Sequence, residues 1–121
     1  MKWTMPAALL LCLAPLPSFA GSWSGVLVDS KCYENLRTNT NPFEPYPDEN
    51  LDLWYCRPNL HTKSFAVVRE DWARFKLDAA GNAKAAELVR NADKKSHYLD
   101  VAVTGELDKG TVQVASISLV K

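Results

Sequence analysis

The sequence predicts a mainly β domain in which five strands form a small barrel and a single helix separates the third strand from the fourth. Three observations support this prediction. After residue 20, most of the chain alternates apolar and polar residues with a period of two, which is typical of strands. Only residues 83–91 show apolar residues at helical spacing. Cys32 and Cys56 bracket a long segment without a sustained period, which predicts a disulfide-tied loop after the first strand.

The first twenty residues have the pattern of a secretory signal peptide. Lys2 supplies a positive charge, residues 7–16 form an apolar run, and residues 18–20 (Ser-Phe-Ala) match the small-x-small pattern of a cleavage site. The apolar run falls short of the roughly 20 residues that a membrane-spanning helix needs. We therefore expect residues 1–20 to be a signal peptide and residues 21–121 to be a single domain, secreted or periplasmic, without a membrane span.

Export to an oxidising compartment determines the chemistry that we expect of the cysteines. Cys12 lies in the predicted signal peptide, which leaves Cys32 and Cys56 as one pair. A disulfide between them would restrict the unfolded chain by roughly 3.5 kcal/mol on the loop-entropy model. A metal site with His61 or His97 is disfavoured, because the cysteines lack the close spacing that is typical of zinc ligands. We expect a disulfide, no metal and no other cofactor.

The first predicted strand covers residues 22–28. Its apolar residues point to both faces, as expected of a strand that bends across a closed sheet. The segment from Cys32 to Leu60 follows, and its many prolines and asparagines predict a loop. Within this loop, the pattern of residues 51–55 fits either a short helical turn or a strand and favours neither.

Two further strands and the helix come next. Residues 64–69 and 73–77 alternate as two strands joined by a hairpin. Residues 78–82 predict a turn, and Asn82 is the predicted N-cap of a helix over 83–91.

The last two predicted strands form the end of the chain, and the fourth shows the clearest alternation. The fourth strand is predicted at 97–104, and a turn at 105–110 follows it. In the fifth strand, Val112 and Val114 lie in the opposite phase to two later apolar residues. A β-bulge near residues 115–116 would bring all of these side chains to one face.

Three strands, a helix and two strands in about a hundred residues is the element order of the OB-fold, a partly open five-stranded Greek-key barrel. An open α+β sheet is the competing architecture. Residues 25–32 match the opening G-x-x-x-D-S-x-C, and residues 103–105 match the strand end V-T-G, of a family of small secreted bacterial domains that the chain resembles. This resemblance implies an OB-like fold and export, and it implies no catalytic residue.

Aromatic side chains form the candidate binding surface, because such side chains anchor protein interfaces and sugar rings. Four lie on the predicted loop, and one lies beside basic residues on a face that many OB domains use for ligands. The candidate residues are Phe43, Tyr46, Trp54, Tyr55 and Trp72. In the alternative interpretation, the loop residues fold down as a lid over the barrel end and Trp72 packs in the core.

Charge and motif content narrow the function classes. The chain has 14 basic and 14 acidic side chains and a formal net charge of zero, which disfavours a nucleic-acid partner. The acidic residues of the loop match no calcium-binding pattern, and Ser30 lacks the glycine-flanked turn of a nucleophilic serine. We therefore expect no catalytic residue.

We expect an exported, non-catalytic binding or interaction module of the bacterial envelope, whose partner is an envelope or extracellular protein or saccharide. One alternative is a structural or stress-related envelope protein without a small ligand. A hydrolase or metal-dependent enzyme is a third class, and no motif in the sequence favours it.

Overall fold

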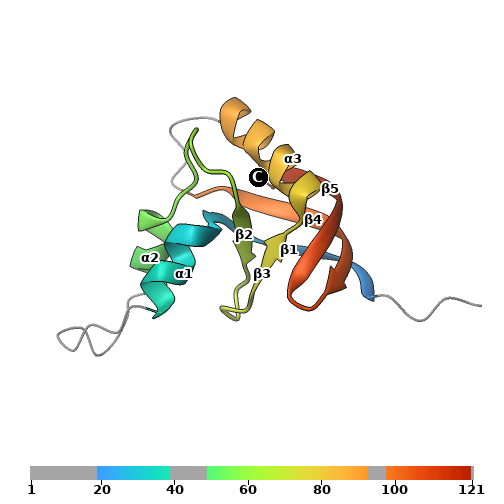
Figure 1. Cartoon of the computed structure of the whole chain (residues 1–121), viewed down its shortest axis with the longest axis horizontal. Helices are drawn as coiled ribbons and strands as arrows, with labels where there is room; N and C mark the ends of the chain where they lie inside the picture. The colour runs from blue at the N-terminus through green and yellow to red at the C-terminus, as the bar shows by residue number, and fades with distance from the viewer. Residues whose placement is uncertain (1–18, 39–48, 93–97, 121) are drawn as a thin grey trace, which may run out of the picture.

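The structure, a computed structural model, describes residues 19–38, 49–92 and 98–120. Its strands form a closed barrel in the order β1-β2-β3-β5-β4 (Figure 1). The five strands are β1 (Phe19–Asp29), β2 (Phe65–Val68), β3 (Arg74–Leu77), β4 (Asp100–Asp108) and β5 (Thr111–Leu119). The predicted mainly β barrel is confirmed, and its topology is OB-like.

The long strand β1 connects the two sides of the barrel. Its first part pairs antiparallel with β4, from Phe19 opposite Leu107 onward, and its last part pairs antiparallel with β2. Parallel pairing of β3 with β5 closes the barrel. β1 begins before the predicted residue 22 and includes the two residues that precede the predicted cleavage point, and that cleavage stays a prediction.

The segment after β1 contains two helices. One of them, within the predicted loop from Cys32 to Leu60, was not predicted, and the other covers residues 51–55, where the sequence left a helical turn or a strand open. Helix α1 (Ser30–Thr38) follows β1 directly, and helix α2 (Glu49–Tyr55) ends just before Cys56. The Oδ1 atom of Asp29 accepts a hydrogen bond from the Cys32 backbone N–H at 3.1 Å, which caps α1. Because only Ser30 and Tyr33 of α1 are buried, the helix has no long apolar stripe that a periodicity search could find.

The predicted disulfide between Cys32 and Cys56 is confirmed, with a Cα–Cα distance of 5.4 Å. It joins the first turn of α1 to the residue after α2. An ion pair between Arg37 and Asp52, at 3.5 Å, links the same two helices. Figure 1 shows α1 and α2 together on one side of the barrel.

Helix α3 (Ala79–Asn91) lies between β3 and β4, as predicted, but it begins before residue 83. Asp78 is its N-cap, and the prediction of Asn82 as the cap was wrong. The Asp78 Oδ1 atom accepts hydrogen bonds from the backbone N–H groups of Gly81, at 2.9 Å, and Val114, at 3.2 Å. This carboxylate therefore both caps α3 and attaches the helix to β5, which Figure 1 shows beside it.

The β4–β5 hairpin is longer than predicted. β4 begins at Asp100, not at residue 97, and continues through most of the predicted turn at 105–110. The turn itself is Lys109-Gly110, where both residues have positive φ angles, as two-residue hairpin turns require.

The predicted β-bulge in the fifth strand is confirmed. Thr104 pairs with Ser116 and Gly105 with Val114, which leaves Ala115 as the extra residue. As a result, Val114 is buried and Ile117 packs against the same core, although the two lie three positions apart in a strand.

Both faces of β2 and of the last part of β1 are buried, because the barrel has a core on each side of them. The inner core fills the barrel and comprises Leu27, Phe65, Val67, Phe75, Leu77, Ala85, Val101, Val103, Val112 and Val114. The outer core lies under α1 and α2 and comprises Val28, Tyr33, Leu53, Cys56, Ala66 and Val68. Successive residues of one strand therefore enter different cores, which explains the apolar residues on both faces of β1.

Candidate functional site

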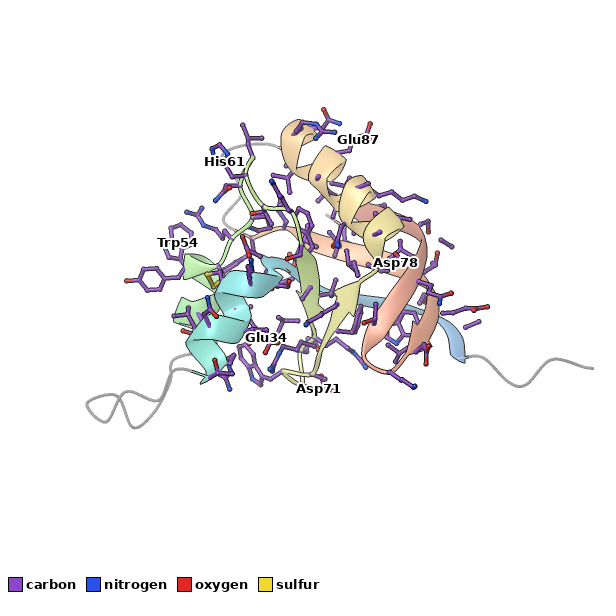
Figure 2. The ribbon with its side chains drawn as sticks, viewed as in Figure 1. Glu34, Trp54, His61, Asp71, Asp78 and Glu87 are labelled. Carbon is purple, nitrogen blue, oxygen red and sulfur yellow. A yellow bond between two sulfur atoms is a disulfide. The ribbon has the colours of Figure 1, made fainter. Side chains whose placement is uncertain are left out.

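The end of α2 presents two aromatic side chains at the surface. Trp54 is 36 % exposed and Tyr55 is 68 % exposed, whereas the next residue, Cys56, is buried and bonded to Cys32. Figure 2 shows Trp54 projecting from this helix. The disulfide therefore fixes the backbone from which these rings project. This part of the segment is a helix and not a strand, which resolves the two interpretations of residues 51–55.

Trp54 lies between two other side chains. The Arg57 guanidinium carbon is 3.7 Å from the centroid of the Trp54 ring, and Arg57 Nε donates a hydrogen bond to the Trp54 carbonyl at 3.2 Å. The Tyr98 ring meets Trp54 edge to face, with centroids 6.3 Å apart. We call Trp54, Tyr55, Arg57 and Tyr98 the α2 surface. Sequence reasoning missed both Arg57 and Tyr98. Tyr98 is far from Trp54 along the chain, and only the folded barrel brings the two rings into contact.

The remaining predicted surface residues do not join the α2 surface. Trp72 lies in the turn between β2 and β3 with a φ of 66° and is 37 % exposed, so it belongs to neither core. In Figure 2 the labelled neighbour Asp71 lies at the tip of this hairpin, well away from Trp54. Phe43 and Tyr46 lie outside the residues that the structure describes.

Helix α1 and the outer core cover the outward face of β2, which the sequence offered as part of a ligand-binding face. Ala66 and Val68 on that face are buried with Tyr33 of α1. On β3, Arg74 is bound by Glu34 of α1, with Nε–Oε1 at 2.7 Å and Nη2–Oε2 at 3.3 Å. A flat stacking platform of the kind used for oligonucleotides is therefore not open here.

The hydrogen bond from Arg74 lowers the pKa of the Glu34 carboxyl from its ordinary value of 4.5, and the same bond raises the pKa of Arg74. The carboxylate is the stabilised form. The pair therefore stabilises the fold above the ordinary pKa of Glu34, and this contribution disappears as the pH falls through the lower folded-state pKa.

We expect a double-mutant cycle with Glu34→Gln and Arg74→Gln to give a coupling free energy of about 0.2–1 kcal/mol at pH 7. The effect is small because both side chains are more than one third exposed, at 37 % and 35 %. Urea unfolding of the four proteins measures the coupling. It should vanish when the carboxyl of Glu34 is protonated in strong acid, and an unchanged coupling there would contradict the assignment.

The described residues contain no group of three or more His, Cys, Asp or Glu side chains that could hold a metal ion. Of the two histidines, His61 is exposed and His97 lies outside the described part of the chain. No helix among residues 19–38, 49–92 and 98–120 has the length and apolar character needed to cross a membrane. Comparison with protein-family models, curated proteins and solved structures finds no match for this chain.

Proposed function

We propose that the chain is an exported, non-catalytic binding module of the bacterial envelope that contacts its partner through the α2 surface. The observation that carries the proposal is the exposure of Trp54, Tyr55 and Tyr98 on and beside a helix end held by a disulfide. Tyrosine, tryptophan and arginine dominate binding energy at protein interfaces. A surface held by a disulfide also loses little conformational freedom when it binds.

Three features support export. The signal-peptide pattern of residues 1–20 directs a chain out of the cytoplasm, and a disulfide persists in an oxidising compartment. The resemblance of residues 25–32 to small secreted bacterial domains supports the same location.

A protein partner is favoured over a saccharide by the surroundings of Trp54. Sugar rings stack on an open aromatic face, whereas Arg57 lies over the Trp54 ring and Tyr98 contacts it from another side. The open ring is that of Tyr55. An arginine stacked on tryptophan next to an open tyrosine is the composition expected of a protein interface.

Site-specific photocross-linking in the exporting bacterium tests this proposal. We expect a benzophenone amino acid at Tyr55 to form a covalent adduct with an envelope protein, identified by mass spectrometry. The same amino acid at Glu87, an exposed position on α3, is the control and should give no such adduct.

A benzophenone amino acid at position Trp72 tests the second aromatic region of the predicted surface, which lies on the β2–β3 hairpin. An adduct at Trp72 but not at Tyr55 would move the binding surface to the β2–β3 hairpin and contradict the proposal. A polysaccharide adduct at Tyr55 would contradict the protein partner, and no adduct at either position would favour an envelope protein without a binding partner.

A further inference from the structure

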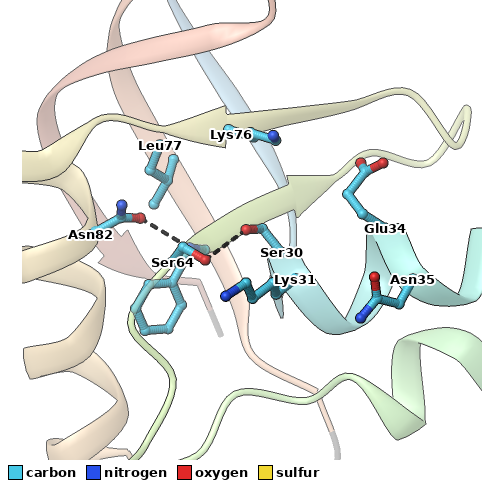
Figure 3. A pocket seen from close by; sticks show the side chains of 9 residues that line it. Ser30, Lys31, Glu34, Asn35, Ser64, Lys76, Leu77 and Asn82 are labelled. Atoms are coloured by element: carbon cyan, nitrogen blue, oxygen red, sulfur yellow. Dashed lines mark hydrogen bonds between the residues drawn. The ribbon is translucent and has the colours of Figure 1, made fainter.

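A pocket separate from the α2 surface lies where the start of α1 meets β2, β3 and the first turns of α3. Its volume is about 390 Å³, within the range of small-molecule sites in proteins. The polar side chains that line it include Ser30, Lys31, Glu34, Ser64, Lys76 and Asn82 (Figure 3). These residues come from four separate parts of the chain, so the closed barrel is needed to bring them together.

Two neutral side chains of the pocket, Ser64 and Asn82, each have a hydrogen-bond donor that no described residue accepts. Ser30 Oγ donates to Ser64 Oγ at 2.9 Å, which leaves the hydroxyl hydrogen of Ser64 available. Asn82 Oδ1 accepts from the Phe65 backbone N–H at 2.9 Å, and this bond fixes which end of the amide is the donor. Among the described residues, neither the Ser64 hydroxyl nor the Asn82 NH₂ group donates to an acceptor.

The described lining of the pocket carries two lysines, Lys31 and Lys76, and one carboxylate, Glu34, whose pKa the charge of Lys76 helps to lower. Its carboxylate, Glu34, already binds Arg74 through both oxygens. Lys31 and Lys76 form no ion pair with any residue that the structure describes. Figure 3 shows the Lys31 side chain extending toward Ser64, while Lys76 extends from β3. The donors that the lining offers to a ligand are therefore the ammonium groups of Lys31 and Lys76, the Ser64 hydroxyl and the Asn82 NH₂ group.

We propose that this pocket binds a small organic oxyanion, a carboxylate or a phosphate monoester. Such a ligand offers several acceptor oxygens and a negative charge, and it would satisfy the donors of Ser64 and Asn82 together with the charge of Lys31 or Lys76. The pocket is large enough for one sugar-sized molecule. This proposal goes beyond a macromolecular partner at the α2 surface, and either proposal can fail without the other.

The test is an NMR titration of the isotopically labelled exported chain with defined probes. The probes are glucuronate as the carboxylate, glycerol 3-phosphate as the phosphate monoester, and methyl glucoside as the neutral control. We expect saturable shifts of the backbone amides of Ser30, Lys31, Ser64 and Asn82 with at least one of the two anions and none with methyl glucoside. The anion with the lower dissociation constant identifies the chemistry.

Two variants test the assignment of the donors. Asn82→Asp keeps an oxygen that accepts from the Phe65 N–H, but it replaces the donor NH₂ with a negative charge, so we expect a folded protein without saturable anion binding. Lys31→Gln should weaken binding about tenfold, the effect of losing one charge-assisted hydrogen bond. Arg90→Gln, at an exposed position near the C-terminal end of α3 and outside the pocket lining, is the charge-matched control and should leave binding unchanged.

Three results would overturn the proposal. They are the absence of saturable shifts with both anions, equal shifts with methyl glucoside, and unchanged anion affinity in a folded Asn82→Asp protein. Loss of the Tyr55 cross-link with intact anion binding would instead remove only the protein partner proposed for the α2 surface.

Discussion

Replacing both disulfide cysteines, Cys32→Ala together with Cys56→Ala, is expected to lower the free energy of unfolding by about 2–4 kcal/mol. The disulfide closes a loop with a sequence separation of 24, so its loss frees the unfolded chain. Cys56 is also 1 % exposed and part of the outer core, which adds a packing loss. A domain of this size has a total stability of about 5–15 kcal/mol, so we expect the variant to fold but to unfold at lower denaturant.

The loss of stability should be concentrated on the side of the barrel that α1 and α2 cover. Without the disulfide, only non-covalent contacts hold the two helices to each other and to the barrel. They include the packing of the outer core, the Arg37–Asp52 and Glu34–Arg74 ion pairs, and the backbone hydrogen bond from Asp29 N–H to the Cys56 carbonyl at 2.8 Å. Amide hydrogen exchange should therefore accelerate in α1 and α2 more than in β4 and β5.

Urea unfolding of the variant and of the oxidised protein measures the loss, and the reduced wild type is the matched control because it has the same chain without the covalent bond. Both should lose similar stability. A variant whose unfolding free energy stays within about 0.5 kcal/mol of the oxidised protein, the range of ordinary surface substitutions, would contradict the structural role of this bond.

Gly25→Ala is expected to destabilise the protein by about 3 kcal/mol, as overpacking of a core does. A Cβ atom at this position would meet the carbonyl oxygen of Val68 closer than atoms can approach, and Val67 Cγ1 at 2.8 Å. The obstacle is backbone, and it belongs to β2, whose residue Val68 pairs with Val26. The strand therefore cannot move aside without breaking the β1–β2 ladder and both cores that it separates.

Gly110→Ala is the matched control. This glycine has a φ of 83°, but a Cβ atom added to it would have no other atom within 4 Å, so only the cost of a left-handed alanine remains, about 1 kcal/mol. Urea unfolding of both variants separates the two effects. If Gly25→Ala costs no more than Gly110→Ala, the close approach of β1 and β2 is not as the structure shows it.

Several elements were predictable because their signals are local. In β5, the alternation of apolar residues changes phase between the two valines and the later isoleucine. A bulge keeps such side chains on one face of a strand, so the pattern predicted the bulge at Ala115 closely. The disulfide followed because a predicted exported domain retains only Cys32 and Cys56.

Other elements were missed where a local signal had two interpretations. Asp78 and Asn82 are both good N-cap residues, and the choice of Asp78 depends on Val114 of β5, which donates to the same carboxylate. Helix α1 was missed because its buried face is narrow, and its Tyr33 is buried only through packing with distant residues such as Val28 and Val68 in the outer core.

The amino-acid pattern alone was sufficient for the element order, the barrel class and the cysteine pair, because alternation, helical spacing and turn residues report on backbone conformation and one-sided burial within a few residues. The contact of Trp54 with Tyr98, the covering of β2 by α1, and the meeting of Ser64, Lys31 and Asn82 in one pocket were decided by closure of the barrel. These residues are far apart along the chain, and no local pattern encodes which distant side chains become neighbours when β3 pairs with β5.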